Sequence, residues 1–192
     1  MLKILFDVET IAVIFGFICV YLTVKENIWC WPTGIVNIIC FIILFTNSRL
    51  YGQVFLQVVF FILSIYGWYQ WLHGGKDGSR LKVSRLNTRK IVFYSGFTVV
   101  FTLLVGFGLH RFAGEEVGYL DAFITGLSLV AQYLMAKKKL ESWLGWITVD
   151  VLSIGMFAYK GLYKTSLLYL AFLILATIGF FEWKKNYRPE PA

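Results

Sequence analysis

The chain alternates between long apolar runs and short polar breaks, and seven of the runs are long enough to cross a membrane. A helix needs about 20 apolar residues to span the hydrocarbon core of a bilayer. The runs lie at 8–24, 28–46, 51–72, 91–110, 119–136, 142–159 and 163–183. We therefore predict an all-α integral membrane protein with seven transmembrane helices, in a single membrane domain covering residues 1–192.

Composition and charge support this prediction and suggest an orientation. The chain is 58% hydrophobic, with a mean hydropathy of +0.70, which is too apolar for a soluble domain of this length. Of the 18 Lys and Arg residues, 13 lie on the side of the C-terminal tail, so we expect that tail to be cytoplasmic and the N-terminus to be outside. The net charge of +7 then indicates topology and contact with the lipid bilayer, with no nucleic acid as a partner.

An internal repeat is visible at an offset of 112 residues. It pairs Trp31 with Trp143, Leu50-Tyr51 with Leu162-Tyr163, Gly67 with Gly179 and Trp71 with Trp183. This pattern predicts a first three-helix repeat at 8–72, a basic, solvated linker and fourth helix at 73–118, a second three-helix repeat at 119–183 and a tail at 184–192. Such a 3+1+3 parallel repeat is SWEET-like, and transporters of this kind bind their substrate between the repeats, near the midplane.

Strongly polar side chains occur near mid-depth in four of the predicted helices. They are Asn37, Gln57, Ser128 with Gln132 on one helix face, and Asp150. A charged group at this depth is costly, so Asp150 is expected to face the protein interior or a watery cavity. The amides are candidates for substrate binding. Their alternative role is interhelical hydrogen bonding, and Asp150 could instead have a structural partner or carry a proton.

The stretch from Glu141 to Asp150 is the strongest candidate for a binding site. Trp143, Trp146 and Asp150 are spaced about one helical turn apart and therefore share a face. Indole rings beside a carboxylate suit a flat organic cation, through the ring quadrupole and the countercharge together. The alternative for the two tryptophans is an interfacial belt, which suits Trp143, near Lys139, better than Trp146.

Signals of catalysis or of a bound cofactor are missing from the sequence. There is no nucleophile paired with a base, no phosphate-binding glycine loop and no cluster of metal ligands. We therefore expect a protein that is not an enzyme and that needs neither metal nor cofactor. A non-transporting structural or partner-binding membrane subunit is the alternative to a transporter, and it would not need polar groups gathered at one depth.

Six motifs are spread over the chain. They are Trp31-Pro-x-Gly34 followed by Asn37, Leu50-Tyr51-x5-Gln57, Ile65-Tyr-Gly-Trp-Tyr-x-Trp71, Glu141-x-Trp143-x-x-Trp146-x3-Asp150, Lys160-Gly-Leu-Tyr163 and Gly179-x3-Trp183. Together these motifs resemble the PnuC family of bacterial vitamin-precursor transporters. The resemblance covers nearly the whole chain, from about Glu9 to Trp183.

The resemblance implies facilitated diffusion of nicotinamide riboside across the bacterial inner membrane by a homotrimer, with trapping by cytoplasmic phosphorylation. It also implies that Trp143 and Trp146 stack on the pyridinium, while Asn37, Gln57 and Gln132 bond the amide or ribose. The chain departs from the pattern at Asp150, where nicotinamide riboside transporters of the family carry Asn. The resemblance extends to related members that carry thiamine, another flat cation, so it leaves both substrates open.

Overall fold

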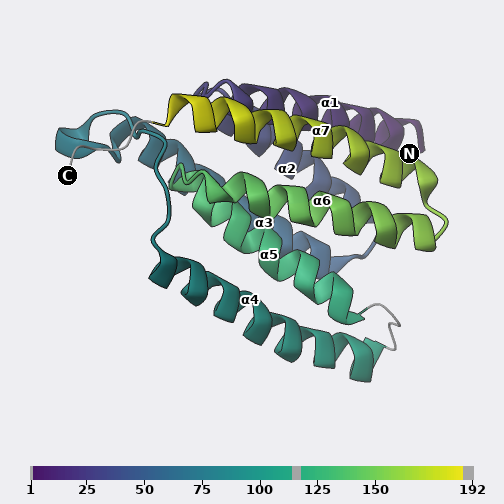
Figure 1. Ribbon diagram of the computed structural model, residues 1–192. Coiled ribbons are helices and arrows are strands. Elements are labelled where there is room, and N and C mark those ends of the chain that lie inside the picture. The colour runs from purple at the N-terminus through teal and green to yellow at the C-terminus, as the bar shows by residue number, and fades with distance from the viewer. Residues whose placement is uncertain (1, 114–117, 188–192) are drawn as a thin grey trace. The chain divides into compact units, whose positions relative to one another are not determined.

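The computed structural model describes residues 2–113 and 118–187, and seven long helices make up most of these residues (Figure 1). They are α1 (Leu2–Val24), α2 (Cys30–Asn47), α3 (Tyr51–His73), α4 (Thr88–Gly108), α5 (Gly118–Ala136), α6 (Glu141–Tyr159) and α7 (Tyr163–Asn186). Each of the seven is long and apolar enough to cross a membrane. The all-α class and the seven predicted helices are therefore confirmed.

Several helices extend beyond the apolar runs that predicted them. Helix α1 begins at Leu2, before the expected residue 8, and α7 continues to Asn186, past residue 183. Helix α4 begins three residues early because Asn87 caps it, its side chain accepting a hydrogen bond from the Lys90 amide at 2.9 Å. A helix can continue past the edge of the hydrocarbon core wherever such groups satisfy its backbone, so hydropathy alone underestimates its length.

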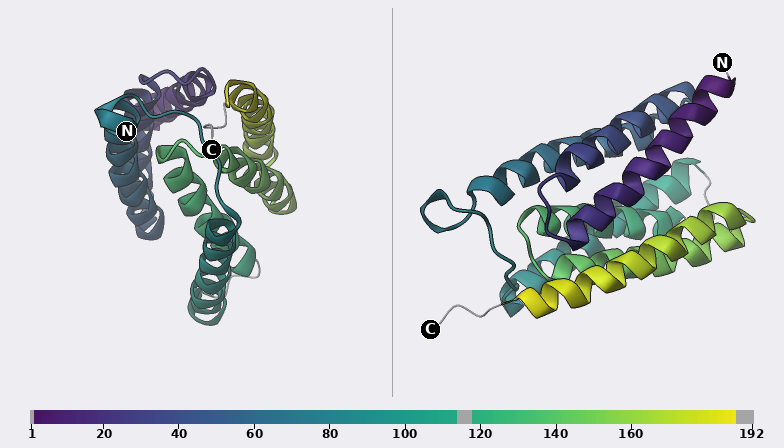
Figure 2. Two further views of the ribbon diagram at one scale, coloured as in Figure 1. Left: turned by 60° about the vertical axis from the view of Figure 1, so that its left-hand side comes forward. Right: turned by 90° about the horizontal axis from the view of Figure 1, so that it is seen from above.

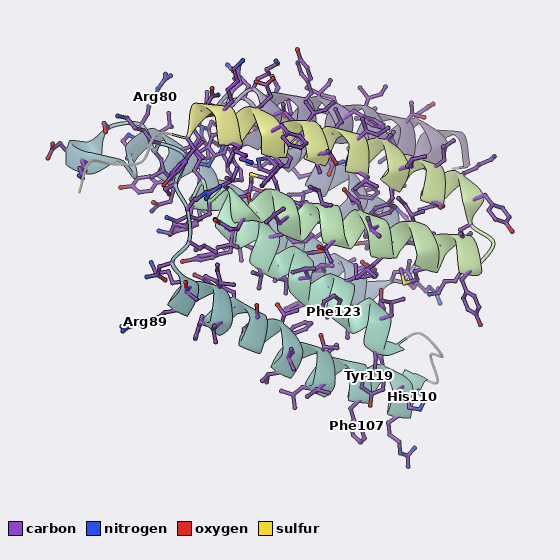
Figure 3. The ribbon with its side chains drawn as sticks, viewed as in Figure 1. Arg80, Arg89, Phe107, His110, Tyr119 and Phe123 are labelled. Atoms are coloured by element: carbon purple, nitrogen blue, oxygen red, sulfur yellow. The ribbon has the colours of Figure 1, made fainter. Side chains whose placement is uncertain are left out.

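The chain divides into two compact units, residues 1–82 and 83–192. In the first unit α2 packs against both α1 and α3, and in the second the helices α4 to α7 pack in sequential pairs. Successive helices within each unit run in opposite directions (Figure 2). Figure 3 shows Arg89 at the start of α4 and His110 and Tyr119 at the other end of the α4–α5 pair, where their rings lie 5.9 Å apart.

Each unit contains a cluster of two tryptophans and one glycine that joins two neighbouring helices. Between α2 and α3, Trp31 lies edge-to-face with Trp71 at 5.4 Å and its ring contacts Gly67. Between α6 and α7, Trp143 lies edge-to-face with Trp183 at 5.4 Å and its ring contacts Gly179. The interplanar angles are 89° and 88°. The offset of 112 residues found in the sequence thus relates two clusters of closely similar geometry.

The turns before α2 and α6 are also alike. The backbone is left-handed at Glu26 (φ 53°) and at Lys138 (φ 51°), which are again 112 residues apart. After α2 and α6, Arg49 (φ 57°) and Gly161 (φ 73°) occupy matching left-handed positions. Glycine adopts this conformation without the steric cost that a side chain adds, so only the second of these later turns is free of strain.

Most of the long connection after α3 is exposed, but residues 84–86 bind the turn before α6. Ser84 donates its amide to the Lys138 carbonyl at 3.1 Å, and its own carbonyl accepts the Leu140 amide at 2.9 Å. The Lys139 ammonium donates to the Ser84 hydroxyl at 2.7 Å. Residues 84–86 therefore form a backbone clip on this turn. A hydropathy pattern carries no information about such main-chain pairing.

The clip also affects the electrostatics of Lys139. Partial burial lowers the pKa of its ammonium, and the nearby cations Lys90 and Lys137 lower it further, whereas Glu141 acts in the opposite direction. Glu141 is itself engaged, since its carboxylate accepts the Leu86 amide at 3.0 Å. Several positive charges therefore lie close together at the turn before α6, and the Glu141 carboxylate partly offsets them.

Candidate binding site

Helix α6 begins immediately after the clipped turn, and it presents the predicted site residues along one face. The Ser142 and Trp143 amides donate back to the carbonyls of Lys139 and Leu140, which starts the first turn. Glu141 supplies a negative charge there, where the helix dipole favours it. From this start, Trp143, Trp146 and Asp150 follow at intervals of three and four residues and so share a face of the helix.

Asp150 is buried, with 4% of its surface exposed. Within the described residues, no hydrogen bond or ion pair satisfies its carboxylate. A buried carboxylate is costly unless a donor or a countercharge compensates it. The position is therefore chemically suited to receiving a cationic or hydrogen-bond-donating ligand.

The two tryptophans of the motif occupy different environments. Trp143 is 2% exposed, because its ring abuts Gly179 and lies edge-on to Trp183. Trp146 is half-buried and packs at the border of a small apolar cluster on α5 and α6. Trp143 therefore has the surroundings of a packing residue, although its Nε1 is buried without a partner among the described residues. Of the two rings, Trp146 has the more accessible one.

Helix α5 packs against α6 and carries Ser128 and Gln132. The Ser128 hydroxyl is buried and donates to the Ile124 carbonyl at 2.8 Å, so its proton is already used within the helix. Gln132, one turn further on, is half-buried. The two helices approach closely, because a Cβ built on Gly145 would lie 2.9 Å from that of Ala131. The second unit thus brings the α5 and α6 candidates onto two adjacent helices.

Asn37 and Gln57 belong to the first unit, on the neighbouring helices α2 and α3. The Asn37 amide donates to the Ala12 carbonyl of α1 at 2.6 Å. This is the interhelical hydrogen bond that the alternative interpretation of the amides predicts, and it leaves the side-chain oxygen of Asn37 for other donors. Gln57 is half-buried.

Three side chains beside Asp150 were absent from the sequence-based site. Tyr169 of α7 stacks on Phe157 of α6, with ring centroids 5.2 Å apart and an interplanar angle of 24°. Ser153 is 1% exposed and lies one turn after Asp150. Its position three residues after the acid was the available signal in the sequence. Among the described residues, no group of three or more His, Cys, Asp or Glu could hold a metal ion.

Comparisons with known proteins find relatives among vitamin transporters. Residues 8–185 match the family described as the nicotinamide mononucleotide transporter. The nicotinamide riboside transporter PnuC of Escherichia coli (strain K12) is 29% identical over 206 residues, which cover 94% of this chain and 86% of that protein. The riboflavin/roseoflavin transporter RibM of Streptomyces davaonensis is 27% identical over 193 residues, covering 94% and 88% of the two chains.

A solved structure supports the same fold. The crystal structure of the vitamin B3 transporter PnuC is similar to this chain with a TM-score of 0.71 and 24% identity, over 93% of this chain and 80% of that one. The family and its solved structure are those of transporters and not of enzymes. Together with the seven apolar helices, the match over residues 8–185 shows that the chain belongs to the nicotinamide mononucleotide transporter (PnuC) family of multi-pass bacterial inner membrane proteins.

Proposed function

We propose that the protein carries nicotinamide riboside across the bacterial inner membrane by facilitated diffusion, as a precursor for NAD biosynthesis. The observation that carries the proposal is the buried Asp150 carboxylate, which no hydrogen bond satisfies within the described residues, one turn from the accessible ring of Trp146. Nicotinamide riboside is a flat pyridinium cation, so the ring would stack on the indole while the carboxylate supplies the countercharge. Phosphorylation in the cytoplasm would then trap the substrate.

The other predicted site residues extend this proposal. Gln132 and Ser128 on α5 would bond the amide or the ribose of the substrate, and Asn37 and Gln57 are further proposed substrate-binding residues. Trp143 would contribute chiefly by fixing α6 against α7, through its contacts with the glycine and the second tryptophan of its cluster.

The transport cycle follows from the proposed repeat. Residues 8–72 and 119–183 would form two parallel three-helix repeats joined by the linker and α4, with the N-terminus outside and the C-terminus in the cytoplasm. The matching tryptophan–glycine clusters and the matching turns support an internal repeat of three helices. Rocking of one repeat against the other would expose the site alternately to the two sides of the membrane. We further propose that the functional protein is a homotrimer.

Thiamine is the second candidate substrate, because the carboxylate at position 150 is compatible with its cationic ring. Nicotinamide riboside transporters of the family are expected to carry Asn here, and a carboxylate suits the thiazolium cation as well as the pyridinium. Riboflavin, named for the RibM relative, has a neutral ring to which the charge of Asp150 offers no countercharge. Of these three vitamins, the two cations therefore fit this site better.

Binding to the purified protein tests the proposed site. We expect Trp146→Ala and Asp150→Ala each to weaken nicotinamide riboside binding at least tenfold, about 1.4 kcal/mol. Thr148→Val is the matched control, because Thr148 is exposed on α6 and its hydroxyl only bonds the Leu144 carbonyl. Full affinity in both site variants would show that the substrate binds elsewhere. Asp150→Asn separates charge from hydrogen bonding, since retained affinity would mean that the charge does not hold the cation.

Uptake into proteoliposomes tests the transport mode. A facilitator equilibrates labelled nicotinamide riboside without accumulating it, and a protonophore leaves the rate unchanged under an imposed pH gradient. Proton-coupled transport through Asp150 would instead accumulate the riboside, and that accumulation would collapse when the protonophore is added.

A further inference from the structure

Ser153 is a buried hydroxyl that its surroundings leave unsatisfied. It lies on α6, three residues after Asp150, and is 1% exposed. Its Oγ has no hydrogen-bond partner within the residues that the structure describes. Buried polar side chains in folded proteins nearly always have a partner, so an exception calls for a physical explanation.

Five other hydroxyls in the helices of the second unit behave differently from that of Ser153. They donate to the carbonyl one turn earlier in their own helix, at 2.7 to 3.0 Å; these residues are Thr98, Thr102, Ser128, Thr148 and Thr177. For Ser153 the equivalent acceptor is the Val149 carbonyl, yet the hydroxyl does not bond it. The Ser153 hydroxyl thus does not bond the carbonyl of the preceding turn, and it remains available to a group from outside the helix.

The surroundings of Ser153 continue the face that carries the proposed cation site. Trp146, Asp150, Ser153 and Phe157 are spaced by four, three and four residues, so they lie along one face of α6. Phe157, at the end of this face, stacks on Tyr169 of α7. Ser153 lies about 4.5 Å along the helix axis from Asp150. That separation is comparable to the distance between a pyridinium ring and the hydroxyls of a sugar attached to it.

The corresponding face in the first unit is apolar. The offset of 112 residues pairs Asp150 with Ile38 and Ser153 with Phe41, and Phe41 stacks on Phe45 at 5.5 Å. Helix packing of this design therefore does not itself require an acid and a hydroxyl at these two positions. The polar pair in α6 is an addition to the shared scaffold.

We propose that Ser153 is a substrate-binding residue that hydrogen-bonds a sugar hydroxyl of an N-glycoside whose flat cationic ring lies at Trp146 and Asp150. The inference rests on the proposed function and extends it, because it assigns the sugar, and not only the ring, to a defined side chain. A ligand of this class would satisfy the Ser153 hydroxyl when it binds, and the residue would then select for glycosides over cations that lack a sugar.

Two probes separate sugar recognition from ring recognition. Nicotinamide riboside carries both parts, whereas 1-methylnicotinamide has the same cationic ring with a methyl group in place of the ribose. The affinity of each is measured by its competition with labelled nicotinamide riboside on the purified full chain. We expect Ser153→Ala to bind the riboside about tenfold more weakly and to bind 1-methylnicotinamide within twofold of wild type. Unchanged riboside affinity, or equal losses for both probes, would overturn the proposal.

Stability provides a second readout that a merely structural serine would not reproduce. Removing an unsatisfied buried hydroxyl relieves a cost, so Ser153→Ala is expected to melt no lower than wild type. Ser166→Ala is the matched control, because the Ser166 hydroxyl donates to the Ile154 carbonyl of α6 at 3.0 Å. That variant should melt lower and keep its riboside affinity. A lower melting temperature for Ser153→Ala would instead assign Ser153 a packing role.

Failure of this inference can be distinguished from failure of the proposed function. If Trp146→Ala and Asp150→Ala weaken both probes while Ser153→Ala weakens neither, the ring site stands and the sugar assignment is wrong. If the wild-type protein binds no riboside at all, the proposed function itself fails, and the role assigned to Ser153 fails with it.

Discussion

Gly179 allows α7 to approach the buried ring of Trp143, and replacing it with alanine tests that packing. An added Cβ would lie 2.6 Å from Cη2 and Cζ2 of Trp143 and 2.8 Å from Cε2. Carbon atoms in contact prefer about 3.5–4.0 Å, so the ring or the helix would have to move by about 1 Å. Trp143 is 2% exposed and its neighbour Trp183 is 0% exposed, so neither can move without disturbing other contacts.

The expected magnitude follows from two opposing effects. Overpacking of a well-packed interior costs about 1–3 kcal/mol. Replacing a helical glycine with alanine recovers about 0.5–1 kcal/mol. Gly155→Ala on α6 is the matched control, because nothing lies within 4 Å of its added Cβ and only the second effect operates. The difference between the two variants therefore isolates the overpacking, and it corresponds to a melting temperature about 2–12 °C lower for Gly179→Ala.

Thermal unfolding of the detergent-solubilised protein measures this difference, with both variants under identical conditions. The double variant Gly179→Ala with Trp143→Phe should recover part of the loss, since phenylalanine lacks the distal ring atoms that meet the new Cβ. Such coupling between contacting residues is typically 0.5–3 kcal/mol. If Gly179→Ala melts at the same temperature as Gly155→Ala, the close packing described for this cluster is incorrect.

Three further predictions concern the clip and the first unit. Because the pKa of Lys139 is lowered in the folded state, the unfolded chain binds more protons between that value and its ordinary 10.5, so stability should rise with pH there. The melting temperature of the wild type should therefore rise relative to that of Lys139→Met as the pH increases. A difference between the two that does not change with pH would refute this. Ser84→Pro removes the amide that bonds Lys138 and should accelerate hydrogen exchange at Leu140; unchanged exchange would contradict the clip. Asn37→Ala breaks the bond to α1 and should cost about 1 kcal/mol of stability by thermal melting, whereas an unchanged melting temperature would argue against that bond.

Much of the architecture could be predicted from the sequence, because apolar runs of membrane-spanning length permit few other structures. The shared face of Trp146 and Asp150 was also predictable, since helical periodicity alone determines it. The surroundings of Trp143 were not predictable in the same way. A tryptophan near the end of a span has the same sequence pattern whether it lies at the lipid interface, stacks on a ligand or packs against a glycine 36 residues later in the chain.

Ser153 and the clip were not predicted, for two different physical reasons. A serine in a membrane helix usually bonds the carbonyl of the preceding turn, so only the side-chain conformation reveals one that does not. The clip depends on main-chain hydrogen bonds that join Ser84 to Lys138 and Leu140, which lie far from it in the sequence. Backbone pairing of this kind leaves no periodic trace in a short basic segment.

Calorimetric titration of the purified protein with nicotinamide riboside and, separately, with thiamine tests the central claim most directly. Our account predicts binding of the riboside, weakened at least tenfold by Trp146→Ala and by Asp150→Ala. Binding of thiamine alone would contradict the proposed substrate and would make Asp150 the residue that selects the vitamin. Binding of neither compound would contradict the assignment of a flat cation to this site.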